Sequence, residues 1–158
     1  MTVRNYLSAA ALVLAFATPA LALEAKKEIM VDTTPAKAWA AIGDFCAIGS
    51  WHPAIEKCVL GKKGGKTIRT LSLKGGGTIV EELVSRDDKK MSYTYTILES
   101  PLPVAHYKST IHVSEMNGTM IDWHGSFDAK GAPDAKAIEV IEGIYQAGLD
   151  SLGAKSKS

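Results

Sequence analysis

The sequence predicts an α+β fold in which a curved antiparallel sheet of about seven strands wraps around a long C-terminal helix. Two patterns predict it. Between residues 55 and 129, segments of alternating apolar and polar residues are separated by turns rich in Gly, Asp or Pro. Residues 133–152 instead place their apolar side chains along one helical stripe. The sheet has to bury its apolar face, and this helix is the only large partner that the sequence offers.

The first residues of the chain have the order of a secretory signal peptide. Arg4 is followed by an apolar run over residues 6–17 and by the small-residue triplet Ala-Leu-Ala at residues 20–22. The apolar run is shorter than the about 20 residues that a membrane span requires, although an uncleaved anchor is an alternative. We therefore expect cleavage of residues 1–22, no membrane span afterwards, and one exported domain over residues 23–158. A short leader with a single Arg is typical of bacteria, so the expected location is the periplasm.

Composition and motifs narrow the class of function. The formal net charge is +1 over 158 residues, so the surface offers no electrostatic reason to expect nucleic acid binding. The segment GKKGGKT, residues 61–67, is one residue short of a phosphate-binding loop, and a strand follows it where that motif requires a helix. No dinucleotide fingerprint, His-Glu-x-x-His motif or Gly-x-Ser-x-Gly motif occurs. We therefore expect no cofactor, no metal and no catalytic residue.

The elements follow one another along the chain. A short strand over residues 28–31 precedes Thr34 and Pro35, which are typical of a helix N-cap and first turn. This helix extends to about Asp44, and residues 48–53 form a second short helix that ends at a proline. The strands of the sheet then cover residues 55–60, 66–73, 78–85, 91–100, 106–115 and 119–129. The last helix begins near Pro133, with an apolar stripe of Ile138, Ile141, Tyr145, Leu149 and Leu152.

Cys46 and Cys58 are the only cysteines, and they bracket Trp51 and His52. In an oxidising compartment a disulfide between them would close a short loop, which is worth about 3 kcal/mol. Two free thiols are the alternative. A metal site or a catalytic Cys-His pair is disfavoured, because the spacing is not Cys-x-x-Cys and oxidation removes a thiolate nucleophile. We expect a disulfide that supports the segment around Trp51.

Alternation along each strand assigns one face to the interior. The expected inward residues include Tyr93, Tyr95, Ile97, Tyr107, Ile111, Val113, Ile121, Trp123 and Phe127. The loop over residues 116–118 tests this assignment. A three-residue turn with a left-handed Gly118 pairs Glu115 with Thr119, and therefore Ile111 with Trp123. Both inward faces then match, whereas a two-residue turn would oppose an inward residue to an outward one.

The same register brings His112, Asp122 and His124 together on the outer face of the sheet. These residue types could form a surface metal site. We expect an ordinary solvated face instead.

Several segments resemble one known superfamily. They are the triplet Trp-His-Pro after the first two helices, IRTLSLKGGGTIVEEL (68–83), HYKST (106–110) and IYQAGLDSL (144–152). In this order they resemble the START-like, Bet v 1-type superfamily, also described as SRPBCC or as polyketide cyclase/dehydrase and lipid transport. The resemblance implies a helix-grip fold with a hollow between the sheet and the helix. Together with the exported leader, GDF and WHPAI look most like the MxaD-type periplasmic proteins, and this likeness implies periplasmic redox partners of a methanol oxidation system.

The resemblance also supports a choice of residues that face the hollow. Members of the superfamily often point a carboxylate inward from the strand that contains Glu81, which places Ile79 and Glu81 inside, opposite Arg69 and Leu71. Arg69 and Glu81 either pair or lie at the rim in water, or they hold the polar end of a ligand. The loops over residues 73–78 and 99–107 flank the mouth of the hollow in this topology. The candidate ligand-binding residues are Arg69, Leu71, Ile79, Glu81, Tyr95, Tyr107, Ser109, Trp123, Trp51, His52, Ile141 and Tyr145.

The first functional hypothesis is a periplasmic binding protein that holds a small hydrophobic or amphipathic molecule between sheet and helix. Arg69 and Glu81 would hold its polar end, and the tyrosines and Trp123 would surround its body. An enzyme of the cyclase or dehydratase kind is an alternative that would use His52, Tyr107 or Glu81 as acid or base. A third possibility is an accessory protein that docks on periplasmic redox proteins.

Overall fold

The structure of the protein is a computed structural model that describes residues 21–156. Its elements follow the predicted order of one strand, two short helices, six strands and one long helix. The predicted signal peptide, residues 1–22, lies almost entirely outside the described residues. The first strand begins at Leu23, directly after the expected cleavage site. Within residues 21–156, no helix has the length and apolar character needed to cross a bilayer.

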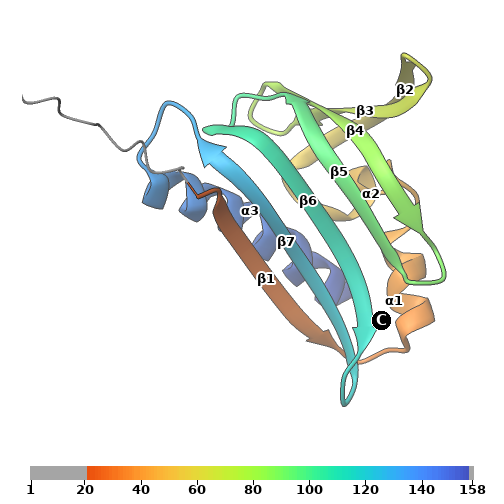
Figure 1. The fold of residues 1–158 in the computed structure, drawn as a ribbon. Coiled ribbons are helices and arrows are strands. Elements are labelled where there is room, and N and C mark those ends of the chain that lie inside the picture. The colour runs from red at the N-terminus through yellow and green to blue at the C-terminus, as the bar shows by residue number, and fades with distance from the viewer. Residues whose placement is uncertain (1–20, 157–158) are drawn as a thin grey trace, which may run out of the picture.

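One seven-stranded antiparallel sheet forms the body of the fold (Figure 1). Its strand order is β1-β7-β6-β5-β4-β3-β2, so the first strand closes one edge against the last, and the remaining strands form a meander. The predicted α+β class with a curved sheet and a gripped helix is confirmed. The strands are β1 (Leu23–Val31), β2 (Ile55–Lys63), β3 (Lys66–Leu73), β4 (Thr78–Asp87), β5 (Ser92–Glu99), β6 (Val104–Glu115) and β7 (Thr119–Ala129).

The two short helices, α1 (Pro35–Ile42) and α2 (Ile48–Trp51), lie between β1 and β2. Thr34 is the N-cap of α1 as predicted, and its hydroxyl accepts a hydrogen bond from the backbone N–H of Lys37 at 3.4 Å. The helix ends slightly earlier than predicted, because Gly43 adopts a φ of 70° that most residues avoid.

The long helix α3 (Asp134–Lys155) runs along the sheet and crosses behind β1 and β7 in Figure 1. It follows Pro133 as predicted. Four residues of the predicted stripe are buried, namely Ile141, Tyr145, Leu149 and Leu152, and Ile138 is half-buried at its edge. The helix therefore buries the apolar face of the sheet.

Two details differ from the sequence prediction. β1 is longer than the predicted strand over residues 28–31, because it pairs with β7 along its whole length from Leu23. The turn after β6 has the predicted register, with Glu115 opposite Thr119. However, Asn117 has the left-handed helical φ of 54°, and Gly118 has a φ of 136°.

The sheet owes its curvature to irregular pairing. The register shifts between β4 and β5 at Val80/Glu81 and again at Leu83/Ser85, and between β6 and β7 at Ala105/Lys108. Such bulges bend a strand and increase its twist. The bends curl the sheet toward α3 (Figure 1).

Gly148 lets α3 approach the interior closely. A Cβ at this position would lie 2.8 Å from Cδ2 of His52, 2.8 Å from Cζ3 of Trp123 and 3.1 Å from Cζ3 of Trp51. Side chains cannot pack at such distances without moving. The aromatic layer beneath the helix therefore depends on this glycine.

We expect Gly148→Ala to lower the free energy of unfolding by about 1–3 kcal/mol, because the new methyl group overpacks this layer. Gly143 is the matched control, since it lies in the same helix with no heavy atom within 4 Å of an added Cβ. Gly143→Ala should raise the free energy of unfolding by about 0.5–1 kcal/mol, because alanine favours the helix. Urea denaturation measures both. Equal effects of the two substitutions would contradict the close approach.

Candidate functional site

A cavity of about 440 Å³ lies between the sheet and α3, with α2 at one end. Its volume lies within the range of about 300–1,000 Å³ that is typical of small-molecule sites. Most of its wall is apolar, and a few polar side chains interrupt it. The lining residues are Ile48, His52, Ala54, Ile55, Leu71, Leu73, Lys74, Gly75, Gly76, Ile79, Glu81, Tyr95, Ile97, Leu102, Tyr107, Trp123, Val140, Ile141 and Ile144.

Glu81 on β4 and Arg69 on β3 form a buried ion pair, with 2.5 Å between Nε of Arg69 and Oε2 of Glu81. Arg69 is 0% exposed and Glu81 is 4% exposed. Burial raises the pKa of Glu81, although the positive charge of Arg69 opposes this shift. Burial by itself would lower the pKa of Arg69, but the negative charge of Glu81 and the hydrogen bond to it raise the pKa above the ordinary value, so the guanidinium stays charged.

Arg69 also joins the sheet to the loop that follows α1. Its Nη1 donates a hydrogen bond to the carbonyl oxygen of Phe45 at 2.5 Å, and its Cζ lies 4.1 Å from the centre of the Phe45 ring. The Tyr95 ring, at 5.0 Å, packs near the same guanidinium. Nη2 of Arg69 is buried and has no hydrogen-bond partner among the described residues.

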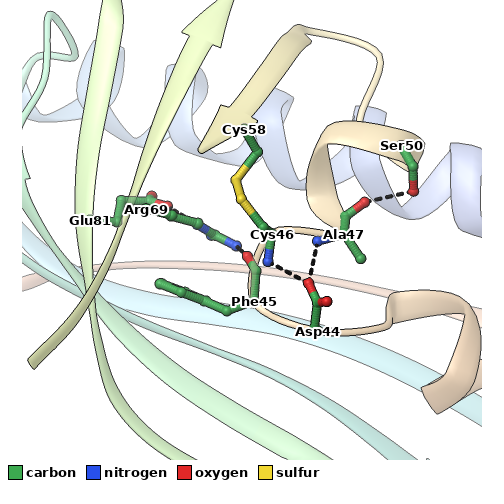
Figure 2. Close-up of a disulfide and its surroundings, with 8 residues drawn as sticks. All are labelled: Asp44, Phe45, Cys46, Ala47, Ser50, Cys58, Arg69 and Glu81. Carbon is green, nitrogen blue, oxygen red and sulfur yellow. Dashed lines mark hydrogen bonds and ion pairs between the residues drawn. A yellow bond between two sulfur atoms is a disulfide. The ribbon is translucent and has the colours of Figure 1, made fainter. Parts of the chain in front are cut away.

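A disulfide holds this loop in place (Figure 2). Cys46 is bonded to Cys58 on β2, with 5.6 Å between their Cα atoms, so the predicted disulfide is confirmed. Oδ1 of Asp44 accepts hydrogen bonds from the backbone N–H groups of Cys46 at 2.8 Å and Ala47 at 2.9 Å. Figure 2 shows the carbonyl of Phe45 directed at Arg69 between these two attachments. The loop thus presents a fixed acceptor to the buried charge.

A chain of hydroxyl groups crosses the wall of the cavity. Nε1 of Trp123 donates to the Tyr95 hydroxyl at 3.0 Å, which lies 3.2 Å from the Tyr107 hydroxyl. The Tyr107 hydroxyl lies 2.6 Å from that of Tyr145, which in turn donates to Ser109 at 2.9 Å. Ser109 donates to a backbone carbonyl of β7 at 2.8 Å. The chain links four elements, β5, β6, β7 and α3.

Burial keeps these phenols protonated. It raises the pKa of Tyr95 and of Tyr107 well above 10, and raises the pKa of Tyr145 to about 12. Gly125 makes the chain possible, because a Cβ there would lie only 2.6 Å from the Tyr145 hydroxyl. The tyrosines therefore serve as neutral hydrogen-bonding groups.

His52 lies at the α2 end of the cavity and has both ring nitrogens engaged. Nε2 lies 3.0 Å from the carbonyl oxygen of Ile144, so this nitrogen carries the proton. Nδ1 accepts a hydrogen bond from the backbone N–H of Ala54 at 3.2 Å. Burial lowers the pKa of His52 below its ordinary value of 6.5, so the ring is neutral.

The structure places the residues predicted for the site in two groups. Those that line the cavity are Leu71, Ile79, Glu81, Tyr95, Tyr107, Trp123, His52 and Ile141. Those that lie behind its wall are Arg69, Ser109, Trp51 and Tyr145. Residues behind the wall keep the lining residues in position by direct contacts. The indole of Trp51, for example, packs 5.8 Å from that of Trp123, while its Nε1 donates to the carbonyl of Ile42 at 3.0 Å.

The predicted list of ligand-binding residues did not include several residues that line the cavity: Ile48, Ala54, Ile55, Leu73, Lys74, Gly75, Gly76, Ile97, Leu102, Val140 and Ile144. Some of them carried a usable signal. Ile97 and Leu73 belong to the inward faces of their strands, and Lys74, Gly75 and Leu102 lie on the loops expected at the mouth. Val140 and Ile144 lie beside the predicted stripe of α3, where helical periodicity alone does not show that a cavity meets the helix.

The outer face of β6 and β7 carries the expected cluster of His112, Asp122 and His124. Asp122 accepts from Nδ1 of His112 at 3.0 Å and from Nδ1 of His124 at 2.7 Å. Among residues 21–156, no group of His, Cys, Asp and Glu side chains has the arrangement of a metal site. The carboxylate instead bridges the two imidazoles.

A curved sheet, a gripped helix and an apolar cavity between them define the class of helix-grip proteins that the sequence predicted. The chain belongs to the family described as polyketide cyclase / dehydrase and lipid transport, whose pattern it matches over residues 22–157. The predicted resemblance to the SRPBCC superfamily is confirmed. No curated protein matches the chain.

Solved structures agree with this assignment. The protein XoxI from Bacillus cereus has 33% sequence identity and a TM-score of 0.80, and the match covers 85% of this chain and 96% of XoxI. An uncharacterized protein from Bacillus thuringiensis has 32% identity and a TM-score of 0.79, with 86% of this chain and 100% of that chain covered. The Zhui aromatase/cyclase from a Streptomyces species has 16% identity and a TM-score of 0.70, with 87% and 94% covered, and shows the shared fold.

We expect Arg69→Met to lower the free energy of unfolding by about 3–5 kcal/mol, because it leaves the Glu81 carboxylate buried without a partner. The double variant Arg69→Met/Glu81→Leu should recover most of this loss, because it removes both charges. Urea denaturation of both variants and of Glu81→Leu at neutral pH gives the coupling between the two positions. The exposed pair Lys136–Glu139 is the control, and Lys136→Met should change stability little. Additive effects at positions 69 and 81 would contradict the coupling.

We expect the free energy of unfolding to fall as the pH drops below about 6.5, since buried His52 resists a proton that the unfolded chain accepts. The unfolded state then binds more protons than the folded state, so acid favours unfolding. Urea midpoints measured from about pH 7.5 to about pH 5 should show this decline, and His52→Gln should reduce it. His106→Asn, at an exposed position, is the control that should keep the decline. An identical pH profile for His52→Gln would contradict the role of His52.

Proposed function

We propose that the protein is an exported binding protein that holds a small hydrophobic or amphipathic molecule in the cavity between the sheet and α3. The observation that carries the proposal is the cavity itself, about 440 Å³ with a mostly apolar wall. An apolar body would bind there because it leaves water, and a few polar groups would orient it.

The lining residues have distinct roles in this proposal. Leu71, Ile79 and Ile141 contact the apolar body of the ligand, and Tyr95 and Trp123 flank it with their rings. Glu81 receives the polar end. Arg69, Ser109, Trp51 and Tyr145 act from behind the wall, because they hold the carboxylate, the hydroxyl chain and the indole in position.

Binding is favoured over a cyclase-like reaction by the state of the polar groups. A general base or acid needs a free lone pair or proton directed at the substrate. Both nitrogens of His52 are engaged, and the Tyr107 hydroxyl lies within hydrogen-bond distance of those of Tyr95 and Tyr145. Glu81 faces the cavity as an acceptor, but its ion pair with Arg69 stabilises the carboxylate and so opposes its uptake of a proton. The cavity therefore suits holding a molecule better than moving protons on it.

A periplasmic location is part of the proposal. The disulfide between Cys46 and Cys58 supports it, because such bonds persist in oxidising compartments. The signal-peptide pattern of residues 1–22 also supports it. The redox partners implied by the likeness to MxaD-type proteins stay a prediction.

We expect naphthalene, a compact apolar probe, to bind to the protein, and we expect Val140→Trp to weaken this binding about tenfold or more by filling the cavity from α3. Isothermal titration calorimetry measures both affinities. Glu139→Trp is the matched control, because position 139 is the exposed neighbour on the same helix. This control should bind naphthalene as the wild type does.

The proposal fails if naphthalene does not bind, or if Val140→Trp binds it as tightly as Glu139→Trp does. Native mass spectrometry of protein isolated from the periplasm, followed by extraction, would identify a resident ligand.

A further inference from the structure

We infer that the polar wall of this cavity selects ligands that donate a hydrogen bond, such as an alcohol, a phenol or an amine, over ligands that only accept one. The inference rests on the proposed function, since it names the chemistry of the molecule that the cavity binds. It follows from the direction of each hydrogen bond in the wall.

The Ser109 end of the hydroxyl chain, which lies away from the cavity, decides which hydroxyl donates in each hydrogen bond. A carbonyl oxygen cannot donate a hydrogen bond. The hydroxyl of Ser109 must therefore donate its only proton to the carbonyl oxygen of His124. Tyr145 must then donate to Ser109, and Tyr107 must donate to Tyr145. Each hydroxyl has one proton, so every step fixes the next.

The same argument also fixes the donors among the residues of the chain that line the cavity. The Tyr107 proton is committed to Tyr145, so Tyr95 must donate to Tyr107 across the 3.2 Å contact. Tyr95 in turn accepts from Nε1 of Trp123, which is a donor only. The three lining residues of this chain, Tyr95, Tyr107 and Trp123, therefore have no proton left for a ligand, and the two tyrosines keep lone pairs.

The other polar side chains of the deep wall add no donor. The one proton of His52 is bonded to the carbonyl of Ile144. Glu81 uses Oε2 for Arg69 and carries no proton while it is paired with that charge. The unpartnered Nη2 of Arg69 is no exception, because Arg69 is 0% exposed and does not line the cavity.

Among the described residues that line the cavity, the only side chain with a proton to donate is that of Lys74, which is exposed on the loop between β3 and β4. The two ends of the cavity wall therefore differ in their hydrogen-bonding groups. A ligand meets acceptors at its buried end, above all the Glu81 carboxylate, and a cation near the solvent. A buried donor on the ligand finds a charged acceptor, whereas a buried acceptor on the ligand gives up its water and finds no side-chain donor.

The test uses two pairs of neutral probes of matched shape. 2-Naphthol donates a hydrogen bond and 2-methylnaphthalene does not, while 2-methoxynaphthalene only accepts one and 2-ethylnaphthalene does neither. We expect 2-naphthol to bind about tenfold more tightly than 2-methylnaphthalene, and 2-methoxynaphthalene to bind less tightly than 2-ethylnaphthalene. Calorimetric titration of the full exported domain gives the four affinities. All four probes are uncharged at neutral pH, so Lys74 does not decide the order by charge.

A substitution of Ser109, which lies behind the cavity wall, tests the order of donors in the hydroxyl chain. Ser109→Ala removes the acceptor that holds the Tyr145 proton, so the chain can reverse and Tyr95 can turn its proton into the cavity. We expect 2-methoxynaphthalene to gain affinity about threefold or more relative to 2-ethylnaphthalene in this variant. Ser114→Ala is the control, because Ser114 is on the same strand and its buried hydroxyl has no hydrogen-bond partner among the described residues. It should leave the ratio unchanged.

The outcomes separate the two proposals. Failure of all four probes to bind would overturn the proposed function and the inference with it. Binding of all four with no preference for 2-naphthol over its methyl isostere, or a preference for 2-methoxynaphthalene over its ethyl isostere, would overturn the inference and leave the proposed function standing. Thermal denaturation confirms that Ser109→Ala is folded, and the wild-type series decides the inference even if it is not.

Discussion

The buried charge of Arg69 is the constraint on which the rest of the structure depends. A guanidinium without solvent must have a counter-charge and acceptors within reach, or the domain would not fold around it. Glu81 supplies the charge from the adjacent strand, and the carbonyl of Phe45 supplies an acceptor from the loop after α1. That loop has to stay in register with the sheet, which explains why Asp44 braces it from within and a disulfide ties it to β2.

The same pair joins structure to function. Glu81 turns one side to Arg69 and another to the cavity, so the group that neutralises the core is also the strongest acceptor that a ligand can meet. A carboxylate in an apolar cavity would ordinarily take up a proton. The charge of Arg69 keeps it available as an anion, and the arginine stays behind the wall where it cannot offer a donor of its own. The pocket therefore depends on a residue that does not line it.

Most of the fold, and part of the site, could be predicted from the sequence. Period-two alternation identified the strands from β2 to β7, and the turn over residues 116–118 set the register that puts Ile111 opposite Trp123. β1 was only partly predicted, because Lys26 and Lys27 interrupt its apolar pattern before residue 28. The alternation of β3 also placed Arg69 on an inward face, and the superfamily resemblance supported the same placement for Glu81 on β4. Neither could show which of these two residues reaches the cavity, since that depends on the length and direction of each side chain.

The glycines and hydroxyl groups of the site show why the remaining features of the site could not be predicted from the sequence. Gly125 and Gly148 give no apolar signal, yet the first leaves room for the Tyr145 hydroxyl, and the second lets His52 and Trp123 pack against α3. The residues of the hydroxyl chain come from separate elements, so no local pattern links them. Once they are linked, a single carbonyl at the outer end decides the orientation of every proton up to the cavity wall. The proton positions along the hydroxyl chain are therefore set by a backbone group that does not line the cavity, through a sequence of bonds that only the folded chain brings together.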